Sequence, residues 1–347
     1  MNMQISRLRL AGLASAALAV VLAAGAASAQ GAYQAPRLVD GRPDLQGVWT
    51  NASLTSLERT ANFKSATIPA EQAAQMEKQR AQMMASQNNA TKTTEGAPRA
   101  GQDVGGYNTF WIDPGTHFGV VNGETRTSWI VDPPSGKIPY SAAGKATYDR
   151  KLMAVRSTFD GPEIRPQGER CIVGFGSTGG PPMINVLYNN NYQIVQTPDH
   201  VVIVVEMNHD ARVIPIGAKH APDSFKKWLG DSIGWWEGDT LVVETINFHP
   251  DIAIRPNMNQ SFYAGENTKV TERFTRVAAD GIRYDFTVED PAAFIQPWKA
   301  EMSLRTAPGR MFEYACHEGN YALPGILAGA RNDERRGIKT EAGGDAE

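Results

Sequence analysis

The stretch Val270-Thr-Glu-Arg-Phe-Thr-Arg-Val-Ala-Ala-Asp-Gly-Ile-Arg-Tyr-Asp-Phe-Thr-Val-Glu289 decides the fold class. In its second half, Ile282, Tyr284, Phe286 and Val288 alternate with charged or polar residues. This period of two is typical of a strand with one buried face and one wet face. The Ala-Ala-Asp-Gly segment before Ile282 is a turn signal between two such runs. We therefore predict an antiparallel hairpin here.

Similar strand-like runs continue on both sides of this hairpin, with turn signals every 8 to 12 residues and no helix expected between them. The pattern predicts an all-β fold, an antiparallel meander closed into a lipocalin-like barrel, because closure removes open sheet edges. The runs that we assign as strands are 44–51, 128–131, 137–140, 192–196, 201–207, 212–216, 233–237, 240–248, 270–277, 282–289, 298–305 and 311–316.

The first third of the chain has a different composition. Residues 69–87 are mostly Ala, Gln, Glu, Lys and Met, which favour a helix. We divide the chain into a signal peptide (1–29), an N-terminal extension with a first strand and one helix (30–106), the β-barrel domain (107–335) and a disordered tail (336–347).

The N-terminus has the features of a secretory signal peptide. Arg7 and Arg9 precede an apolar run from 10 to 25, and Ala27-Ser-Ala29 fits a cleavage site. No later stretch has the roughly 20 apolar residues that span a bilayer. We expect release into the periplasm or the medium.

The charge argues against nucleic acid as a partner. After removal of Arg7 and Arg9, 32 basic and 37 acidic residues remain, and 32 − 37 gives a net charge of −5. A mildly acidic chain without a basic block is a poor ligand for phosphate backbones. We expect a small-molecule ligand, no membrane span and no cofactor.

Cys171 and Cys316 are the only cysteines. In an oxidising compartment this pair predicts a disulfide. The alternative is that Cys316 acts in a site with its neighbours His317 and Glu318.

Three glutamates are spaced by two residues from apolar residues of their strands, so we expect them on the apolar, inward face. They are Glu206, Glu244 and Glu272. A carboxylate inside a barrel is costly unless it is paired, and burial would raise its pKa toward values useful in acid–base catalysis. The alternatives are salt bridges to inward arginines such as Arg212, or a misjudged face.

Three further clusters lie near predicted strand ends. Residues 313–321 contain His317 and Glu318, which could act as an acid–base pair or as metal ligands, and residues 188–192 could present amides and phenols to a ligand or form an Asn-rich turn. The segment from Glu206 to Arg212 contains His209 and Asp210, which suit a general base and its partner, or else a turn. The candidate catalytic residues are Glu206, His209, Asp210, Glu244, His317 and Glu318. The candidate ligand-binding residues are Tyr188, Asn190, Tyr192, Arg212, Glu272 and Tyr314. No two of the six histidines have a standard zinc spacing, so we assign no metal ligands.

Several long motifs resemble those of a family of secreted bacterial β-rich proteins without an assigned activity. They are Asp40-Gly-Arg-Pro-Asp-Leu-Gln-Gly-Val-Trp49, Tyr192-Gln-Ile-Val-Gln-Thr-Pro198, Trp228-Leu-Gly-Asp231, Trp236-Glu-Gly-Asp-Thr-Leu-Val-Val-Glu-Thr245 and Glu313-Tyr-Ala-Cys-His-Glu-Gly-Asn320. Gly47-Val-Trp49 is also similar to the first strand of lipocalin-like (calycin) barrels. The resemblance implies secretion and a β-rich fold.

The sequence leaves three functions open. The first is an enzyme that acts on a small organic molecule by acid–base chemistry, of the lyase, isomerase or hydratase type. The second is a non-catalytic binding protein for an apolar or aromatic ligand, and the third is a structural protein. Charged groups converging in an otherwise apolar pocket would favour the enzyme.

Overall fold

The computed structural model describes residues 33–88, 113–174, 178–252, 255–256, 261–262 and 265–338. The predicted signal peptide, most of the segment after the first helix and most of the predicted tail lie outside the described residues. From Ala35 onward the chain forms one compact unit. Its main strands are β1 (Gly47–Thr50), β5 (Ile130–Asp132), β6 (Asn191–Gln196), β7 (His200–Val205), β8 (Ala211–Pro215), β9 (Asp231–Glu237), β10 (Thr240–Ile246), β13 (Lys269–Ala278), β14 (Gly281–Glu289) and β15 (Trp298–Thr306).

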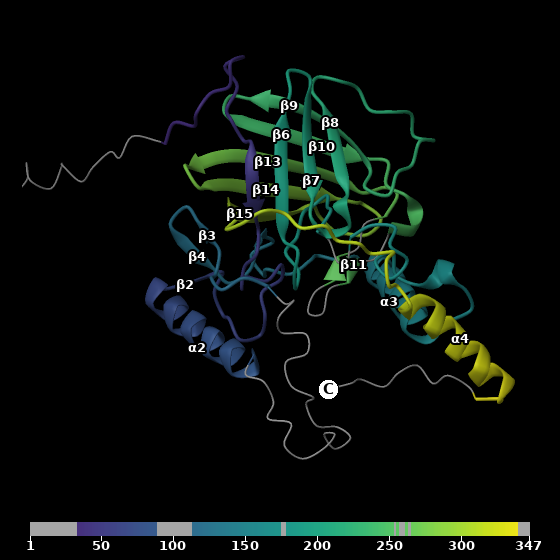
Figure 1. Cartoon of the computed structure of the whole chain (residues 1–347). Coiled ribbons are helices and arrows are strands. Elements are labelled where there is room, and N and C mark those ends of the chain that lie inside the picture. The colour runs from purple at the N-terminus through teal and green to yellow at the C-terminus, as the bar shows by residue number, and fades with distance from the viewer. Residues whose placement is uncertain are drawn as a thin grey trace, which may run out of the picture. The chain divides into compact units, whose positions relative to one another are not determined.

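These strands form one large antiparallel sheet in the order β8-β7-β6-β1-β15-β14-β13-β10-β9, with β5 paired to β15. The two ends of the sheet approach each other (Figure 1). A parallel bridge joins Ile216 to Gly234, and Gly217 N donates to Gly234 O at 2.8 Å. A Cβ on Gly234 would lie 3.0 Å from side-chain carbons of Ile214 and Ile216, so glycine permits this approach. The fold is therefore a nearly closed, barrel-like sheet.

The predicted alternation is confirmed in the strands that decided the fold class. Strands β13 and β14 pair from Lys269↔Glu289 to Ala278↔Gly281, and β14 pairs with β15. Along β14 the residues alternate between buried and half-buried. Tyr284 and Phe286 thus face the core with neighbours from β13 and β15, while the charged residues between them face outward.

Strand β1 has a more central place than its position in the sequence indicated. It pairs with β6 on one side, through Trp49↔Tyr192, and with β15 on the other, through Trp49↔Thr306. Trp49 is buried, its Nε1 donates to Leu45 O at 2.9 Å, and the Arg276 guanidinium lies 5.3 Å from the centre of its ring. The first strand is thus part of the barrel-like sheet.

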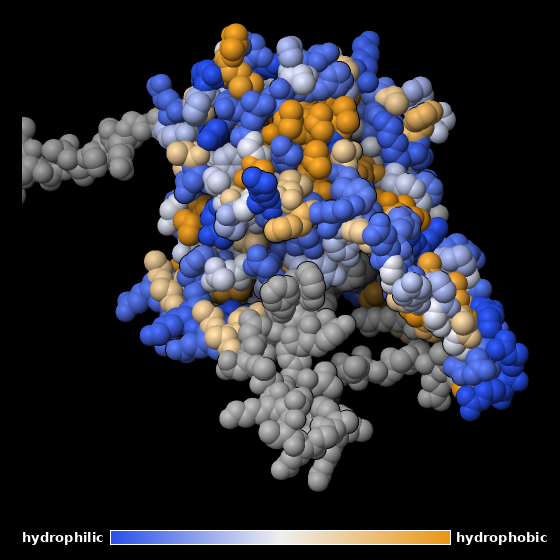
Figure 2. All heavy atoms as spheres, in the orientation of Figure 1, coloured by the Kyte–Doolittle hydropathy of each residue, from blue (hydrophilic) through white to orange (hydrophobic). Residues whose placement is uncertain are grey.

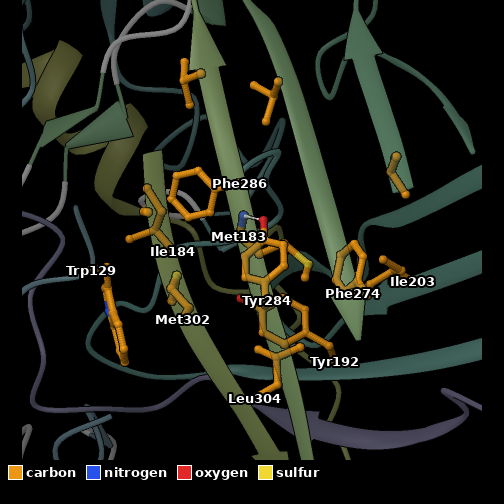
Figure 3. Packing of buried hydrophobic residues seen from close by; sticks show 14 of the residues in the cluster. Trp129, Met183, Ile184, Tyr192, Ile203, Phe274, Tyr284, Phe286, Met302 and Leu304 are labelled. Atoms are coloured by element: carbon orange, nitrogen blue, oxygen red, sulfur yellow. Dashed lines mark hydrogen bonds between the residues drawn. The ribbon is translucent and has the colours of Figure 1, made fainter. Parts of the chain in front are cut away.

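An irregular segment before β6 enters the interior (Figure 3). Met183 and Ile184 are buried against Tyr284, Phe286 and other core residues. Met183 N donates to the Tyr284 hydroxyl at 2.9 Å. The interior of the described part is therefore packed with side chains from the sheet and from this segment.

Three α-helices accompany the sheet in the part of the chain that the structure describes. Helix α2 (Ala70–Asn88) corresponds to the helix predicted for 69–87 and lies beside a small sheet of β2 (Thr67–Ile68), β4 (Glu124–Arg126) and β3 (Val120–Val121) (Figure 1). Helices α3 (Ala142–Ser157) and α4 (Ala322–Arg335) were not expected. Helix α3 lies between the strands predicted for 137–140 and 192–196, so the prediction of a series without intervening helices is wrong there. Short 3-10 turns (Pro162–Ile164, Met207–His209, Pro250–Ile252) and the pair β11 (Arg255–Pro256) and β12 (Ser261–Phe262) complete the elements.

The sequence signals for the two unexpected helices are weak. Helix α3 begins at the Ser141 N-cap, whose hydroxyl accepts from Gly144 N at 2.9 Å. Helix α4 contains Pro324 and two glycines, which lower its helix propensity. No helix among the described residues has the length and apolarity required to cross a bilayer.

The strand predicted for 311–316 is also absent. This segment has irregular backbone, and Phe312 N donates to the side chain of Glu206 at 2.8 Å. A backbone donor that binds a side chain is not available to a strand ladder.

The outer face of the large sheet has two regions of opposite character. On β13, β14 and β15 the outward residues include ion pairs such as Arg283–Asp285 at 2.8 Å. On β6, β7 and β8, the outward residues Val195, Val202, Val204 and Val213 are neighbours in register. Figure 2 shows apolar surface over these strands.

Arg212 on β8 and Glu272 on β13 form an ion pair that is buried inside the sheet. We expect this pair to be required for stability. Glu272→Ala leaves the Arg212 guanidinium buried without its partner, which costs on the order of 3–5 kcal/mol. In urea unfolding followed by circular dichroism, the Glu272→Ala variant should unfold at a much lower midpoint urea concentration than the unaltered protein. As a matched control, Arg273→Ala removes the exposed pair with Glu237 and should change the midpoint little. Equal midpoints for the two variants would contradict this account.

Candidate functional site

The interior of the sheet holds one of the three glutamates that we expected there. Glu272 on β13 is fully buried and forms a bidentate ion pair with Arg212 on β8, with 3.0 Å between Arg212 Nη1 and Glu272 Oε1. Tyr284 Oη donates to the same Oε1 at 2.7 Å. Asn51 Nδ2 donates to the hydroxyl of the buried Tyr192 at 3.1 Å.

Electrostatics in this interior cluster favour the ion pair and the neutral phenols. Burial alone would lower the pKa of Arg212, but the charge and hydrogen bonds of Glu272 outweigh it and raise that pKa. Burial raises the pKa of Tyr192 and of Tyr284, and the Glu272 charge adds to both effects. These groups are enclosed by core side chains, so the cluster is a structural network.

Glu244 lies on the opposite face of β10 from the one that we predicted. The core residues of this strand are Leu241 and Val243, and Glu244 is half-buried on the outer face. The misjudged face has a simple cause, because Val242 on the outer face is also apolar and buried.

Glu206 is buried at the end of β7, where Asn191 Nδ2 donates to it at 2.7 Å and Phe312 N at 2.8 Å. It fastens the chain after β15 to the sheet. Asp210 accepts from Gly174 N at 2.9 Å, and His209 is exposed on the same turn.

The two remaining predicted clusters meet beside a disulfide. Cys171 and Cys316 are bonded, with 5.6 Å between their Cα atoms, as predicted. Burial, together with a hydrogen bond to the neighbouring Tyr188, raises the pKa of Tyr314 to about 12. A polar pocket of about 310 Å³ lies here, lined by Gly168, Glu169, Tyr314, Ala315, Cys316, Glu318, Gly319 and Asn320.

The other predicted residues of this region have separate places. His317 does not line the pocket. Asn190 is buried and bonds the backbone of Val186 and Asp113, which is the role of a turn residue.

A cluster that the sequence did not reveal lies around Glu244. His220 Nδ1 is 3.0 Å from Asp231 Oδ2, and His220 Nε2 is 3.3 Å from Glu244 Oε1. Ala221 N and Lys227 Nζ donate to Asp231 at 2.9 and 2.7 Å. Partial burial opposes ionisation of Asp231, but these hydrogen bonds outweigh it and lower its pKa. The cluster fastens the segment before β9 to the sheet.

A groove of about 680 Å³ lies between helix α2 and the ends of β14 and β15. Most of its wall is apolar. It is lined by Ala70, Ala73, Ala74, Glu77, His117, Phe118, Val120, Thr125, Val277, Ala278, Asp280, Gly281, Ile282, Ser303, Leu304 and Arg305.

The groove contains a carboxylate–imidazole pair that the sequence analysis missed. His117 Nδ1 is 2.9 Å from Glu77 Oε2, and Phe118 N donates to Glu77 Oε1 at 2.8 Å. His117 Nε2 has no hydrogen-bond partner among the described residues. Glu77 and His117 are 40 residues apart, and only the packing of α2 beside β3 and β4 brings them together.

Comparison with known proteins identifies no relative: no family model matches the chain, and neither does any curated protein or solved structure. Within the described ranges, no group of three or more His, Cys, Asp and Glu residues has a geometry that could hold a metal ion.

Asp231 should make folding stability depend on pH in the acid range. Its pKa is lowered from 3.8 by folding, so its stabilisation is present above pH 3.8 and is lost as the pH falls through the native value. The difference in unfolding free energy between the protein and Asp231→Asn should therefore narrow below pH 3.8, in urea titrations from pH 7 downward. Asp223→Asn, which removes an exposed carboxylate from the same segment, is the control. A constant difference would contradict the hydrogen-bonding role of Asp231.

The disulfide should hold the segment after β15 against the sheet. It closes a loop of 145 residues, which in the chain-entropy model contributes about 5 kcal/mol. We expect the Cys171→Ser, Cys316→Ser double variant to unfold at a lower temperature and to be cleaved faster after residue 306 by a protease. Unchanged cleavage would show that noncovalent contacts, such as those of Glu206 with Phe312 and of Asn320 with Glu169, are enough to hold this segment.

Proposed function

We propose that the protein is an enzyme that acts on a small organic molecule by acid–base chemistry in the groove beside α2. The observation that carries this proposal is the Glu77–His117 pair in the wall of that groove. A volume of about 680 Å³ lies within the usual range of ligand pockets. An apolar pocket with a few convergent polar groups is the general form of an active site.

The pair has the arrangement of a general base with its orienting carboxylate. An ionised carboxylate only accepts hydrogen bonds, so Glu77 requires the proton of His117 to be on Nδ1. That tautomer leaves the lone pair on Nε2. The hydrogen bond from Phe118 N to the other oxygen of Glu77 fixes the carboxylate in place. His117 Nε2 can then accept a proton from a substrate bound in the groove.

The chemistry that this site supports is proton transfer at a carbon next to a carbonyl or carboxyl group. His117 removes the proton, and the electron pair moves into the neighbouring carbonyl. In an isomerase the proton returns to another carbon, and in a lyase or dehydratase it leaves with the departing group, as water when that group is hydroxide. The apolar wall strengthens electrostatic interactions because it excludes water from one side of the substrate.

The alternative function is non-catalytic binding of an apolar or aromatic molecule in the same groove. The observation in its favour is that the His117 side chain is 56% exposed, so water reaches the imidazole. Under this alternative Glu77 only holds α2 in place, and turnover is absent.

We also propose that the protein works outside the cytoplasm, in the periplasm or the medium, with its sheet closed into a lipocalin-like barrel. Support for the location comes from the Cys171–Cys316 disulfide, since such bonds persist in oxidising compartments, and from the signal-like N-terminal sequence. Support for closure comes from the bridge between Ile216 and Gly234.

The assay for this function is hydrogen–deuterium exchange. The protein is incubated in D2O with a panel of small aryl and alkyl ketones and carboxylic acids, and loss of the proton signal next to the carbonyl is followed by NMR. We expect exchange with at least one compound, and a fall of about 100-fold or more in His117→Gln, because general-base catalysis contributes at least that factor.

The matched control is His200→Gln. His200 is also a partly exposed histidine beside a carboxylate, with its Nδ1 3.0 Å from Asp199 Oδ1, but it lies outside the groove. Its substitution should leave exchange unchanged. Exchange that is absent across the panel, or equally present in His117→Gln, would sink the enzyme proposal and leave the binding function.

A further inference from the structure

Among the described residues that line the groove, Arg305 is the only lysine or arginine. Its Nη2 donates to Ala52 O at 3.2 Å, and it forms no ion pair with the described residues. Other arginines on neighbouring strands differ, since Arg283 pairs with Asp285 and Arg126 with Glu301. The positive charge of Arg305 is thus oriented by a neutral carbonyl oxygen and is not neutralised by a carboxylate.

One short segment of chain fixes Arg305 and His117 relative to each other. Ala52 O accepts from Arg305, while Leu54 N and Ser53 Oγ donate to His117 O at 2.9 and 3.1 Å. Two residues of extended chain span at most roughly 7 Å. The guanidinium and the backbone of His117 are therefore anchored a few ångströms apart on the same segment.

A close backbone approach strengthens this link. Gly115, two residues before His117, has φ +98° and packs directly on the Ala52–Ser53 peptide. A Cβ at this position would lie 2.5 Å from Ser53 N. Only glycine combines this positive φ with such close contact, so the turn that carries His117 is seated on the segment that holds Arg305.

We propose that the groove selects a monocarboxylate with an apolar body, with its carboxylate bound by Arg305; this inference rests on the proposed function. A guanidinium binds a carboxylate through two parallel hydrogen bonds, and only one of its five N–H groups is used by Ala52. Glu77 and Asp280 also line the groove, and their negative charge disfavours a ligand with a second anionic group.

The position of the Arg305 guanidinium determines where the rest of the ligand would lie in the groove. With the carboxylate at Arg305, the apolar body lies along the exposed side chains of Val120 and Val277 and the alanine face of α2, which line the same groove. The carbon next to the carboxylate then lies on the side of His117. Arg305 thus acts as a substrate-binding residue that sets which proton His117 removes.

The test compares two probes of nearly equal shape, 3-phenylpropionate and its neutral amide, by titration calorimetry in a buffer without carboxylates. We expect the acid to bind more tightly than the amide. In Arg305→Gln the affinity for the acid should fall about tenfold to a hundredfold, as expected for loss of a hydrogen bond between charged groups, while the affinity for the amide stays unchanged. Arg273→Gln, which removes an arginine paired with Glu237 on the outer face, should change neither affinity.

Equal affinities for acid and amide, an equal loss of both in Arg305→Gln, or no binding of either probe would overturn the inference. Its failure is distinct from failure of the proposed function. Arg305-dependent binding of the acid without His117-dependent exchange upholds the ligand class and removes the enzyme. If neutral ketones exchange in a His117-dependent way but the acid binds no more tightly than the amide, the enzyme proposal stands and the monocarboxylate inference is wrong.

Discussion

The ion pair between Arg212 and Glu272 joins the two sides of the sheet where its hydrogen-bond ladder is weakest. Strand β8 has a full ladder with β7 but only the bridge from Ile216 to Gly234 with β9. Arg212 reaches from β8 to β13, which lies two strands beyond β9 in the sheet order. Neither charge can be released into the core alone without a large desolvation cost, so the pair keeps the ends of the sheet together. Tyr284 extends this constraint to Met183 and holds the entering segment in place.

The interior of the sheet is filled with side chains, so its charged groups stabilise the fold. A ligand can bind only in the pockets outside this interior that the described residues line. Of the three glutamates that we predicted to face the interior, only Glu272 does so, and its carboxylate is already bound by Arg212 and Tyr284. A substrate needs groups with unused hydrogen-bonding capacity. Those are found in the groove beside α2, where His117 Nε2 and the guanidinium of Arg305 have capacity left. The sheet therefore acts as a rigid base, and the candidate site is built on its outside by α2 and the strands β3 and β4.

Local patterns predicted the local parts of this fold. Alternation in residues 270–305 identified β13, β14 and β15, and the turn at Gly281 identified their first hairpin. The insertion of β1 between β6 and β15 could not be predicted, since pairing across 140 or more residues leaves no periodic signal in either strand. The face of Glu244 was misjudged because β10 has apolar residues on both faces. The alternation of residue types therefore does not indicate which face of this strand points to the core. The Glu77–His117 pair had no signal either, because each residue is ordinary in its own segment and only tertiary packing gives it a partner.

The two walls of the groove differ in how they are held, and this bears on how a ligand would be recognised. The wall with Arg305 continues from β1 and β15, where Thr50 and Arg305 are partners in register. It inherits the rigidity of the large sheet. Helix α2 is attached through Glu77, which accepts from Phe118 N and contacts His117. The same carboxylate therefore positions the helix and fixes the imidazole tautomer. Protonation of His117 at Nε2 leaves the hydrogen bond from Nδ1 to Glu77 in place and strengthens it, because the imidazolium then carries a positive charge beside the carboxylate that holds α2.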